Sequence, residues 1–375
     1  MEFIDLQAQY SRIGENIDKR IAQVLRDGKY ILGPEVGELE VKLARYAGVK
    51  HCIGVGNGTD ALLIALMALD IGPGDAVFVP AFTFFASAEV IASVGATPVF
   101  VDIRLDSYNI CSESLEKQIL ETKSSGELRL SAVIAVNLFG VPADYDSLEK
   151  ICAREGLKLI EDAAQSFGAK LGGRLSGSFG DVAATSFFPA KPLGCYGDGG
   201  VLLTDCDQLA EKIRSIRVHG KGSDKYENVR IGVNSRLDTI QAAILLEKLD
   251  IYDEEIALRN EVAARYSEAL TEKYEIPFVP KECLSVWAQY TLRTSKERRD
   301  GVLQVMKGAK IPCAIYYPLS VHLQAAFKDL AVNGHLVRDL DLPNCVRAQQ
   351  EVFSIPMHPY LSLKDQSKVI DALLD

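Results

Sequence analysis

Residues 157–165 read Leu-Lys-Leu-Ile-Glu-Asp-Ala-Ala-Gln, and this stretch decides the fold class. Its apolar residues predict a buried strand that ends at the carboxylate of Asp162. Open α/β sheets contain such strands and bind ligands outside their carboxyl ends. Glu161 should point to the opposite face from Asp162, because successive side chains of a strand alternate.

Short β-rich runs alternate with helical runs on both sides of this strand. Alternation of this kind predicts an α/β fold with a mostly parallel sheet flanked by helices. We expect strands at 51–55, 76–79, 97–101, 132–136, 157–160, 181–187 and 200–204, and helices at 6–25, 59–69, 85–93 and most of 237–270.

The length of 375 residues is too great for one small core, so two domains are expected. We assign residues 1–245, including the N-terminal helix, to a large domain. Residues 246–375 form a connecting helix and a smaller C-terminal α+β domain.

Composition excludes several classes of protein. The longest strongly apolar run, 61–69, is far short of a membrane span, and the N-terminus lacks a basic start followed by an apolar stretch. We therefore expect no membrane helix and a cytoplasmic location. The net charge of -10 argues against a nucleic-acid surface, and the five histidines show no metal-ligand spacing, so no metal is expected. The eight cysteines contain no Cys-x-x-Cys pair and indicate buried thiols.

Lys191 lies in the run Thr-Ser-Phe-Phe-Pro-Ala-Lys-Pro-Leu-Gly-Cys-Tyr-Gly-Asp-Gly-Gly of residues 185–200. A lysine among apolar residues and glycines can be kept as a neutral amine, which suits a Schiff base. Asp162 could pair with a pyridinium nitrogen. A lysine for the aldehyde and a carboxylate for the ring nitrogen are what pyridoxal phosphate chemistry requires, so both residues are predicted to be catalytic.

The run Gly-Val-Gly-Asn-Gly-Thr-Asp of residues 54–60 lies between an expected strand and an expected helix. The backbone amides of Gly58, Thr59 and Asp60 could therefore point into a phosphate group at the start of the helix. The hydroxyl of Ser186 could bond the same phosphate. Two other interpretations are open: a dinucleotide fingerprint, in which Thr59 would replace the third glycine, or an ordinary turn with Thr59 as the helix cap.

Three segments, 161–168, the Lys191 run and 232–243, resemble the sugar-nucleotide aminotransferases of the DegT/DnrJ/StrS family in sequence, order and spacing. The likeness covers essentially the whole chain. It implies a fold-type I pyridoxal-phosphate-dependent transferase that acts on a nucleotide-linked keto sugar, with glutamate as the amino donor. It also implies a homodimer with shared active sites.

The resemblance carries further roles to matching positions. Phe84 would stack on the cofactor ring and Gln165 would lie near its hydroxyl, whereas without the family they would be a core phenylalanine and a helix cap. Asn234 would reach the cofactor phosphate of the neighbouring subunit. Arg236 would bind a carboxylate or diphosphate, against the default of a surface arginine without a role. Tyr316, Tyr317 and His322 could approach the sugar.

Within the family, the likeness is greatest to enzymes that aminate UDP-2-acetamido-2-deoxy-3-oxo-glucuronate, which implies a role in making surface polysaccharides such as lipopolysaccharide O-antigen. Those relatives carry a His-Tyr pair where this chain has Tyr316 and Tyr317. A 4-keto sugar or a 3-keto 6-deoxy sugar is the main competing substrate. Three further protein classes stay open: a related dehydratase, which has histidine in place of the lysine, a non-catalytic relative and a nicotinamide dehydrogenase.

Overall fold

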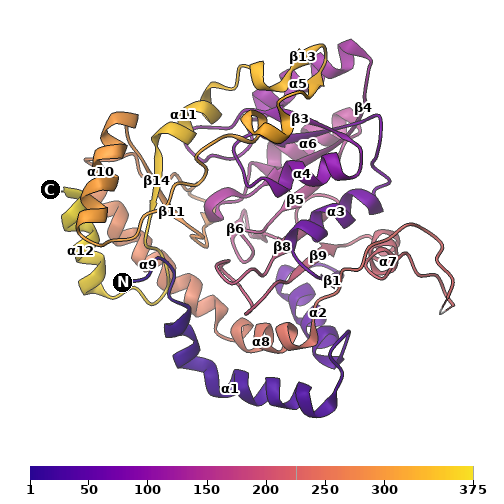
Figure 1. Ribbon diagram of the computed structural model, residues 1–375, viewed down its shortest axis with the longest axis horizontal. Helices are drawn as coiled ribbons and strands as arrows, with labels where there is room; N and C mark the ends of the chain where they lie inside the picture. Colours follow the sequence, from indigo (N-terminus) through magenta and orange to yellow (C-terminus); the bar gives the residue numbers. More distant parts are fainter. Residues whose placement is uncertain (225, 375) are drawn as a thin grey trace.

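A seven-stranded sheet forms the centre of the computed structural model, which describes residues 1–224 and 226–374 (Figure 1). The strand order is β1-β9-β8-β5-β4-β2-β3, and neighbours are parallel except β9, which is antiparallel to β1 and β8. The strands are β1 (His51–Val55), β2 (Asp75–Pro80), β3 (Thr97–Val101), β4 (Arg129–Val136), β5 (Lys158–Asp162), β8 (Val182–Ser186) and β9 (Gly200–Thr204). All seven predicted strands are confirmed.

Both faces of this sheet are covered, as β9 illustrates. Leu202 packs into one hydrophobic cluster, whereas Val201 and Leu203 pack into a second. Successive side chains of a strand point to opposite faces, so the two clusters lie on the two sides of the sheet. This explains why the strands are apolar throughout and do not alternate with polar residues.

Helices cover the sheet and join its strands. The predicted helices at 6–25, 59–69 and 85–93 are confirmed as α1 (Leu6–Asp27), α3 (Gly58–Ala68) and α4 (Ala86–Ser93). The predicted helical segment from residue 237 is confirmed as α8 (Thr239–Leu249) and α9 (Tyr252–Leu270). Before α8, four further helices were not specified from sequence: α2 (Pro34–Ala47), α5 (Ser112–Ser125), α6 (Tyr145–Glu155) and α7 (Asp207–Ile216).

The ends of α1 show how the sequence sets helix boundaries. The side chain of Asp5 accepts a hydrogen bond from the amide of Ala8 and caps the start. Gly28 follows the last turn at φ 66°, a left-handed conformation that glycine adopts without strain. The helix therefore begins and ends where a short polar residue and a glycine allow it.

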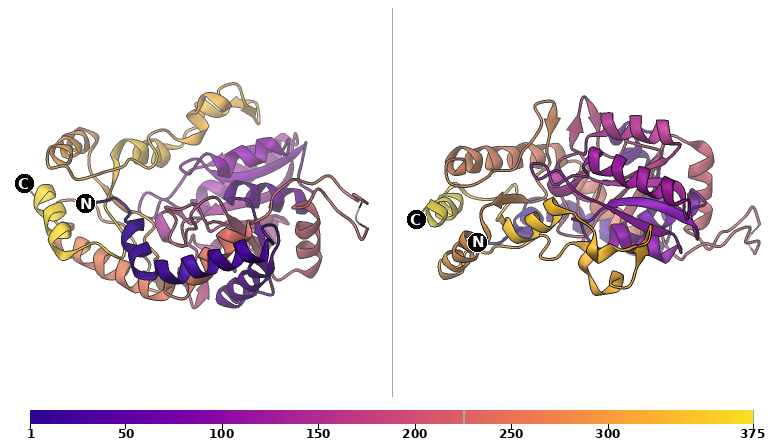
Figure 2. Two further views of the ribbon diagram at one scale, coloured as in Figure 1. Left: turned by 60° about the horizontal axis from the view of Figure 1, so that its bottom comes forward. Right: turned by 90° about the horizontal axis from the view of Figure 1, so that it is seen from above.

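The C-terminal part builds its own core around α9. It pairs β11 (Tyr290–Arg293) with β14 (Val352–Ile355) and packs α10 (Lys296–Gly308) and α12 (Leu363–Leu374) around them (Figure 2). α11 (Pro343–Glu351) and much of the chain before it, from Val321, contribute instead to the first hydrophobic cluster of the large sheet. The division at 245/246 stays a prediction. The remaining short strands are β6 (Lys170–Leu171), β7 (Arg174–Leu175), β10 (Cys283–Leu284), β12 (Ala331–Val332) and β13 (His335–Leu336).

The chain between α7 and α8 forms an arm that extends away from the rest of the molecule (Figure 1). Antiparallel bridges join Val218 to Asn234 and Lys221 to Asn228. The side of the arm that returns to the sheet exposes two apolar side chains to solvent, since Val229 is 51% exposed and Ile231 85% exposed. No helix of the described chain is long and apolar enough to cross a membrane.

Candidate active site

Asp162 ends β5 at the carboxyl edge of the sheet and is buried. Its Oδ2 accepts a hydrogen bond from the hydroxyl of Ser87 on α4 at 2.9 Å, and its Oδ1 accepts one from the amide of Ala164 at 3.2 Å. Burial raises the pKa of Asp162, while these two hydrogen bonds and the charge of Lys191 act in the opposite direction. The site therefore contains a buried carboxylate that a cationic group can stabilise.

Lys191 lies in a turn that follows β8, where its amide donates to the carbonyl of Phe188 at 2.8 Å. Burial lowers the pKa of its ammonium group, and the carboxylate of Asp162 partly offsets that shift. A lowered pKa increases the fraction of neutral amine, which is nucleophilic and can accept and return a proton. The structure thus brings the lysine and the carboxylate predicted from sequence into one electrostatic environment.

The start of α3 lies against the end of β8. A Cβ atom on Gly58 would lie 2.6 Å from the Cβ atom of Ser186, so only glycine fits this approach. Among the described residues, the amides of Gly58 and Thr59 have no hydrogen-bond acceptor. Two amides at a helix start beside a hydroxyl form a cradle suited to a phosphate group.

The structure corrects two details of this loop. The cap of α3 is Asn57, not Thr59, because the side chain of Asn57 accepts the hydrogen bond from the amide of Asp60 at 2.8 Å. That bond also occupies the Asp60 amide, so this amide does not point freely towards an anion as expected. Asn57 is the cap because it directly precedes Gly58, the first residue of the helix.

Gln165 links the loop after β4 to the C-terminal half of the chain. Its Oε1 accepts a hydrogen bond from the amide of Phe139 at 2.8 Å, and its Nε2 donates to the hydroxyl of Tyr317 at 2.9 Å. No helix begins between residues 166 and 181, so the interpretation of Gln165 as a helix cap is wrong. The ring of Tyr317 lies 6.4 Å from that of Phe84. Phe84 is 56% exposed, which excludes a core position for this ring.

The segment that carries Asn234 and Arg236 returns to the phosphate cradle of its own chain. The hydroxyl of Ser235 accepts a hydrogen bond from the amide of Gly56 at 2.9 Å. The side chains of Asn234 and Arg236 have no hydrogen-bond or ion-pair partner among the described residues. Asn234 is exposed and Arg236 is half-buried, so both side chains are available to a ligand or a second subunit.

Tyr316 and His322 have different surroundings, since the ring of Tyr316 lies 5.9 Å from that of Tyr317 whereas His322 is enclosed. Tyr316 is half-buried with its ring 6.4 Å from Phe3. His322 is 1% exposed, its ring centre lies 6.1 Å from that of Phe100, and burial lowers its pKa to about 4. A neutral, enclosed imidazole has no open path to a sugar in this arrangement, and the predicted sugar contact of His322 stays a prediction.

Glu161 points away from Asp162, as predicted, and lies on the other side of β5. Its carboxylate accepts hydrogen bonds from Asn137 Nδ2 at 2.8 Å, Ser176 Oγ at 2.6 Å and the amides of Gly177 and Phe179 at 3.0 Å. Burial raises its pKa to about 7, against the effect of these donors. This network holds the loop after β7 and leaves Asp162 as the carboxylate near Lys191.

Two further residues near the site are Ser87, which bonds Asp162, and Cys195, which is buried. Ser87 was not predicted, although its place in the first turn of the helix after β2 marks it as a residue at the carboxyl edge of the sheet. Cys195 is fully buried, and desolvation raises its pKa to about 11. A thiol of that kind is a poor nucleophile, in agreement with the buried thiols that the cysteine pattern indicates.

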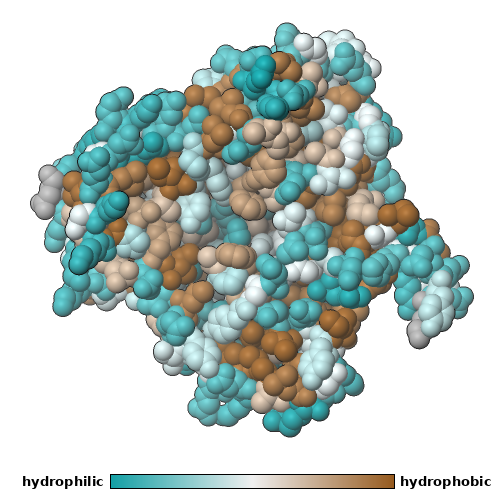
Figure 3. Space-filling model, viewed as in Figure 1, coloured by the Kyte–Doolittle hydropathy of each residue, from teal (hydrophilic) through white to brown (hydrophobic). Residues whose placement is uncertain are grey.

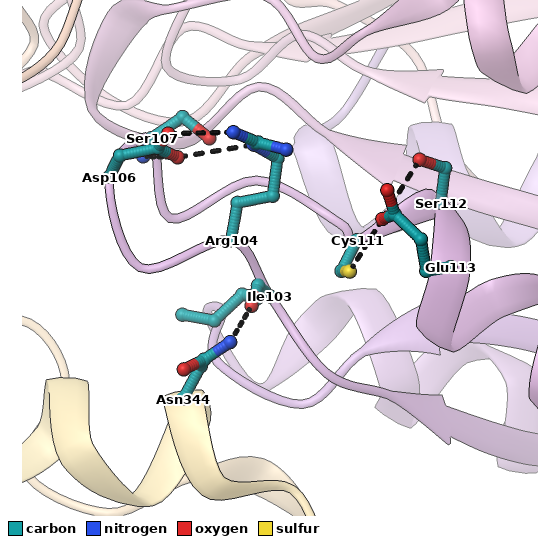
Figure 4. A network of polar contacts seen from close by, with 8 residues as sticks. All are labelled: Ile103, Arg104, Asp106, Ser107, Cys111, Ser112, Glu113 and Asn344. Atoms are coloured by element: carbon teal, nitrogen blue, oxygen red, sulfur yellow. Dashed lines mark hydrogen bonds and ion pairs between the residues drawn. The ribbon is translucent and has the colours of Figure 1, made fainter.

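A cavity of about 800 Å³ lies elsewhere, between the loop after β3 and the C-terminal part of the chain. Figure 4 shows Arg104 paired with Asp106, and Asn344 donating to the carbonyl of Ile103 at 2.8 Å. None of the predicted site residues lines this cavity. Among the described residues, no cluster of histidine, cysteine and carboxylate side chains could hold a metal.

The residues around Lys191 fit pyridoxal phosphate. The Gly58 and Thr59 amides with Ser186 would hold the phosphate, Asp162 would face the ring nitrogen, and Lys191 would hold the aldehyde. When bound, this cofactor supplies an electron sink for a carbanion next to the reacting nitrogen. The protein's own contribution is to desolvate the Lys191 amine, to orient Asp162 through Ser87 and to leave the Gly58 and Thr59 amides free for the phosphate.

Comparison with known proteins agrees with this geometry. The model of the DegT/DnrJ/EryC1/StrS aminotransferase family matches residues 11–374. The chain belongs to this family. It is 48% identical to the UDP-2-acetamido-2-deoxy-3-oxo-D-glucuronate aminotransferase of Pseudomonas aeruginosa, over 96% of each chain.

Solved structures show the same fold. A DegT DnrJ EryC1 StrS aminotransferase from Brucella abortus has a TM-score of 0.96 and 50% identity, with 100% of this chain and 98% of that chain covered. NtdA from Bacillus subtilis, solved with bound cofactor PMP, has a TM-score of 0.87 and 28% identity, with 99% and 82% covered. The chain is therefore a pyridoxal-phosphate-dependent aminotransferase with the fold predicted from its sequence.

Proposed function

We propose that this aminotransferase transfers an amino group from glutamate to a nucleotide-linked keto sugar, specifically UDP-2-acetamido-2-deoxy-3-oxo-glucuronate. One observation carries the chemistry: the half-buried Lys191 and the buried Asp162 influence each other's pKa at the carboxyl edge of the sheet, beside a phosphate cradle. The substrate rests on the 48% identity to an enzyme of that name. The proposed setting is the cytoplasm, in the synthesis of lipopolysaccharide and O-antigen.

The substrate is tested with a panel of nucleotide keto sugars and mass detection of the aminated product. The panel contains the UDP-linked 3-oxo-glucuronate, its uncharged 3-oxo-glucose counterpart, a 4-keto sugar and a 3-keto 6-deoxy sugar. Preference for the 3-oxo-glucuronate supports the proposal. Preference for either of the last two would favour the competing substrate class, and a dehydrated product would indicate the related dehydratase reaction.

Lys191→Ala should bind pyridoxal phosphate without the visible absorption of the covalently held cofactor, and it should lose transamination. The reason is that the buried amine both holds the cofactor and moves the proton. The measurements are the absorption spectrum and a glutamate half reaction. Lys170→Ala, at an exposed lysine on β6, is the control and should behave like wild type. Wild-type turnover by Lys191→Ala would remove the central assignment.

Arg236 is the proposed partner of the sugar carboxylate. Its half-buried guanidinium has no partner in the described chain and follows the segment that reaches the cradle. A charge-assisted pair contributes about 1.5 to 3 kcal/mol, so Arg236→Ala should lower kcat/KM for the 3-oxo-glucuronate roughly 10- to 150-fold. The uncharged 3-oxo-glucose should lose much less.

The comparison of the two sugars decides between roles for Arg236. Equal losses on both would assign the residue to the diphosphate or to support of Asn234. Arg214→Ala, at an exposed arginine on α7, is the matched control and should leave both sugars unaffected.

A homodimer with shared sites is part of the same proposal. Exposed aromatic side chains lie at the site itself: Phe84 is 56% exposed and Phe188 is 53% exposed. The arm adds Val229 and Ile231. Figure 3 shows further apolar residues gathered over α1 and α8, at the bottom of that view. A second copy that covers such residues would remove apolar surface from water and could bring its own Asn234 to the cradle.

A further inference from the structure

A second buried lysine lies behind the segment that carries Lys191. Lys248, on α8, is 1% exposed, and its Nζ donates to the carbonyl of Gly194 at 2.7 Å. The same Nζ lies 3.9 Å from the centre of the Tyr196 ring. Among the described residues, Lys248 has no carboxylate partner within ion-pair distance.

Burial of the Lys248 ammonium group costs free energy of desolvation. Burial lowers the pKa of Lys248 to about 8, although the carboxylate of Glu255 and the thiol of Cys195 favour its charged form. Burial of a cation that has no carboxylate partner costs free energy, and hydrogen bonds to the cation must offset that cost. Here the hydrogen bond goes to the backbone three residues after Lys191.

Gln241 holds the same segment from the same helix. Its Oε1 accepts a hydrogen bond from the amide of Tyr196 at 3.0 Å. Gln241 and Lys248 are seven residues apart, which places them on one face of α8 about two turns from each other. The helix therefore fixes residues 194–196 at two points, a carbonyl and an amide.

The held segment is tightly folded. A Cβ atom on Gly194 would lie 2.6 Å from the carbonyl oxygens of both Phe188 and Pro189, so the chain closes on itself around Lys191. The amide of Cys195 donates to the carbonyl of Phe187 at 2.8 Å. A displacement of Gly194 would consequently be passed to the turn that bears Lys191.

We propose that Lys248 is a positioning residue for Lys191, acting through the carbonyl of Gly194, with Gln241 as the second point of attachment. This rests on the proposed role of Lys191. Loss of either attachment should loosen residues 191–197 and misplace the reactive amine. A misplacement of this kind costs roughly 10- to 100-fold in rate.

The test uses Lys248→Met, which keeps the length of the side chain and removes the donor, and Gln241→Leu. Hydrogen exchange of the amides of residues 191–197 is measured with and without pyridoxal phosphate, and kcat and KM are measured with L-glutamate. Lys212→Met is the matched control, because Lys212 is also a helix lysine that donates to a backbone carbonyl, that of Ala68.

Both test variants should exchange these amides roughly tenfold faster or more, with or without cofactor. Both should also lower kcat roughly 10- to 100-fold with KM for glutamate nearly unchanged, while Lys212→Met changes neither quantity. Lys248→Arg, which keeps a donor, should recover part of the kcat. If Lys248→Met does not fold, Gln241→Leu and Lys248→Arg decide by the same two measurements.

Wild-type exchange and kcat in Lys248→Met would overturn the proposal, as would a loss of kcat without faster exchange in residues 191–197. A wild-type protein with no reaction towards glutamate would instead overturn the proposed function. The exchange measurement without cofactor separates the two failures, because it reports on the segment whatever the reaction is.

Discussion

The carboxylate of Asp162 shows how one residue acquires a role from its surroundings. Burial raises its pKa, while the hydroxyl of Ser87, the amide of Ala164 and the charge of Lys191 favour its ionised form. A carboxylate in this balance pairs strongly with a cation that enters the site, because little water screens the pair. That is the property required of the group that faces a protonated ring nitrogen.

Asp162→Asn should keep the fold and much of the cofactor binding but lower kcat about 100- to 1000-fold, since an amide cannot stabilise the ring cation. Single-turnover absorption with L-glutamate measures this directly. Ser87→Ala should give a smaller loss in the same direction, because it removes one hydrogen bond to the carboxylate. Ser93→Ala, on the exposed end of the same helix, is the control, and unchanged turnover in Asp162→Asn would contradict the assignment.

For His322 we predict an effect on the stability of the folded protein at acid pH. Its pKa in the folded protein is about 4, below the ordinary value of 6.5, so the folded state binds fewer protons than the unfolded state between these values. Stability is therefore lost as the pH falls from about 6.5 to 4, by roughly 3 kcal/mol for this one group.

His322→Phe should remove that part of the acid destabilisation, as measured by urea unfolding at pH 7 and pH 4. His335→Phe, at an exposed histidine, should keep the wild-type dependence. If His322→Phe instead raises KM for the nucleotide sugar and leaves the pH dependence unchanged, the residue contacts the substrate sugar.

At the scale of elements, the junction of α3 with β8 decides whether a phosphate group can be bound. Asn57 takes up the Asp60 amide, and the amides of Gly58 and Thr59 stay open. The close approach of Gly58 to Ser186 brings the hydroxyl to the same place. Many helices begin in this way. This helix start differs because it lies against the end of β8, and only a glycine at position 58 allows the two elements to approach so closely.

Gly58→Ala should weaken binding of pyridoxal phosphate and lower the free energy of unfolding by about 1 to 3 kcal/mol, because the added methyl group overlaps Ser186. Equilibrium binding followed by absorption and a urea titration measure the two effects. Gly37→Ala is the matched control: it lies within α2 with open space around it and should stabilise the protein by about 0.5 to 1 kcal/mol. Unchanged cofactor affinity in Gly58→Ala would place the phosphate elsewhere.

At the scale of the whole molecule, the arm after α7 connects the site to a second copy in the proposed dimer. Ser235 bonds Gly56 in its own chain, yet the adjacent Asn234 side chain is exposed and has no partner in the described chain. The two neighbours thus have different surroundings. Ser235 can therefore support the phosphate cradle of its own chain while the exposed Asn234 contacts the cradle of a second subunit in the proposed dimer.

Mixing inactive subunits tests this arrangement. Lys191→Ala and Asn234→Ala homodimers should each fail at limiting cofactor, whereas hybrids should regain one intact site, with Lys191 from one subunit and Asn234 from the other. Activity is measured after the hybrids are confirmed by native mass spectrometry. Hybrids without recovered activity would show that Asn234 acts within its own subunit.

The sequence by itself predicted the strands, their order along the chain and the candidate pair Lys191 and Asp162. These are local properties. An apolar run that ends in a carboxylate, or a lysine among glycines and apolar residues, can be recognised from neighbouring residues without knowledge of tertiary contacts. The family resemblance added Phe84, Gln165, Asn234 and Arg236, whose types alone are common on any surface.

Only the tertiary structure decided which groups meet across long separations. The bond from Ser87 to Asp162 spans 75 residues, that from Gln165 to Tyr317 spans 152, and that from Lys248 to Gly194 spans 54. It also enclosed His322 and gave the cap of α3 to Asn57. No periodicity encodes such contacts, because they depend on how the helices pack against the sheet and on which atoms that packing removes from water.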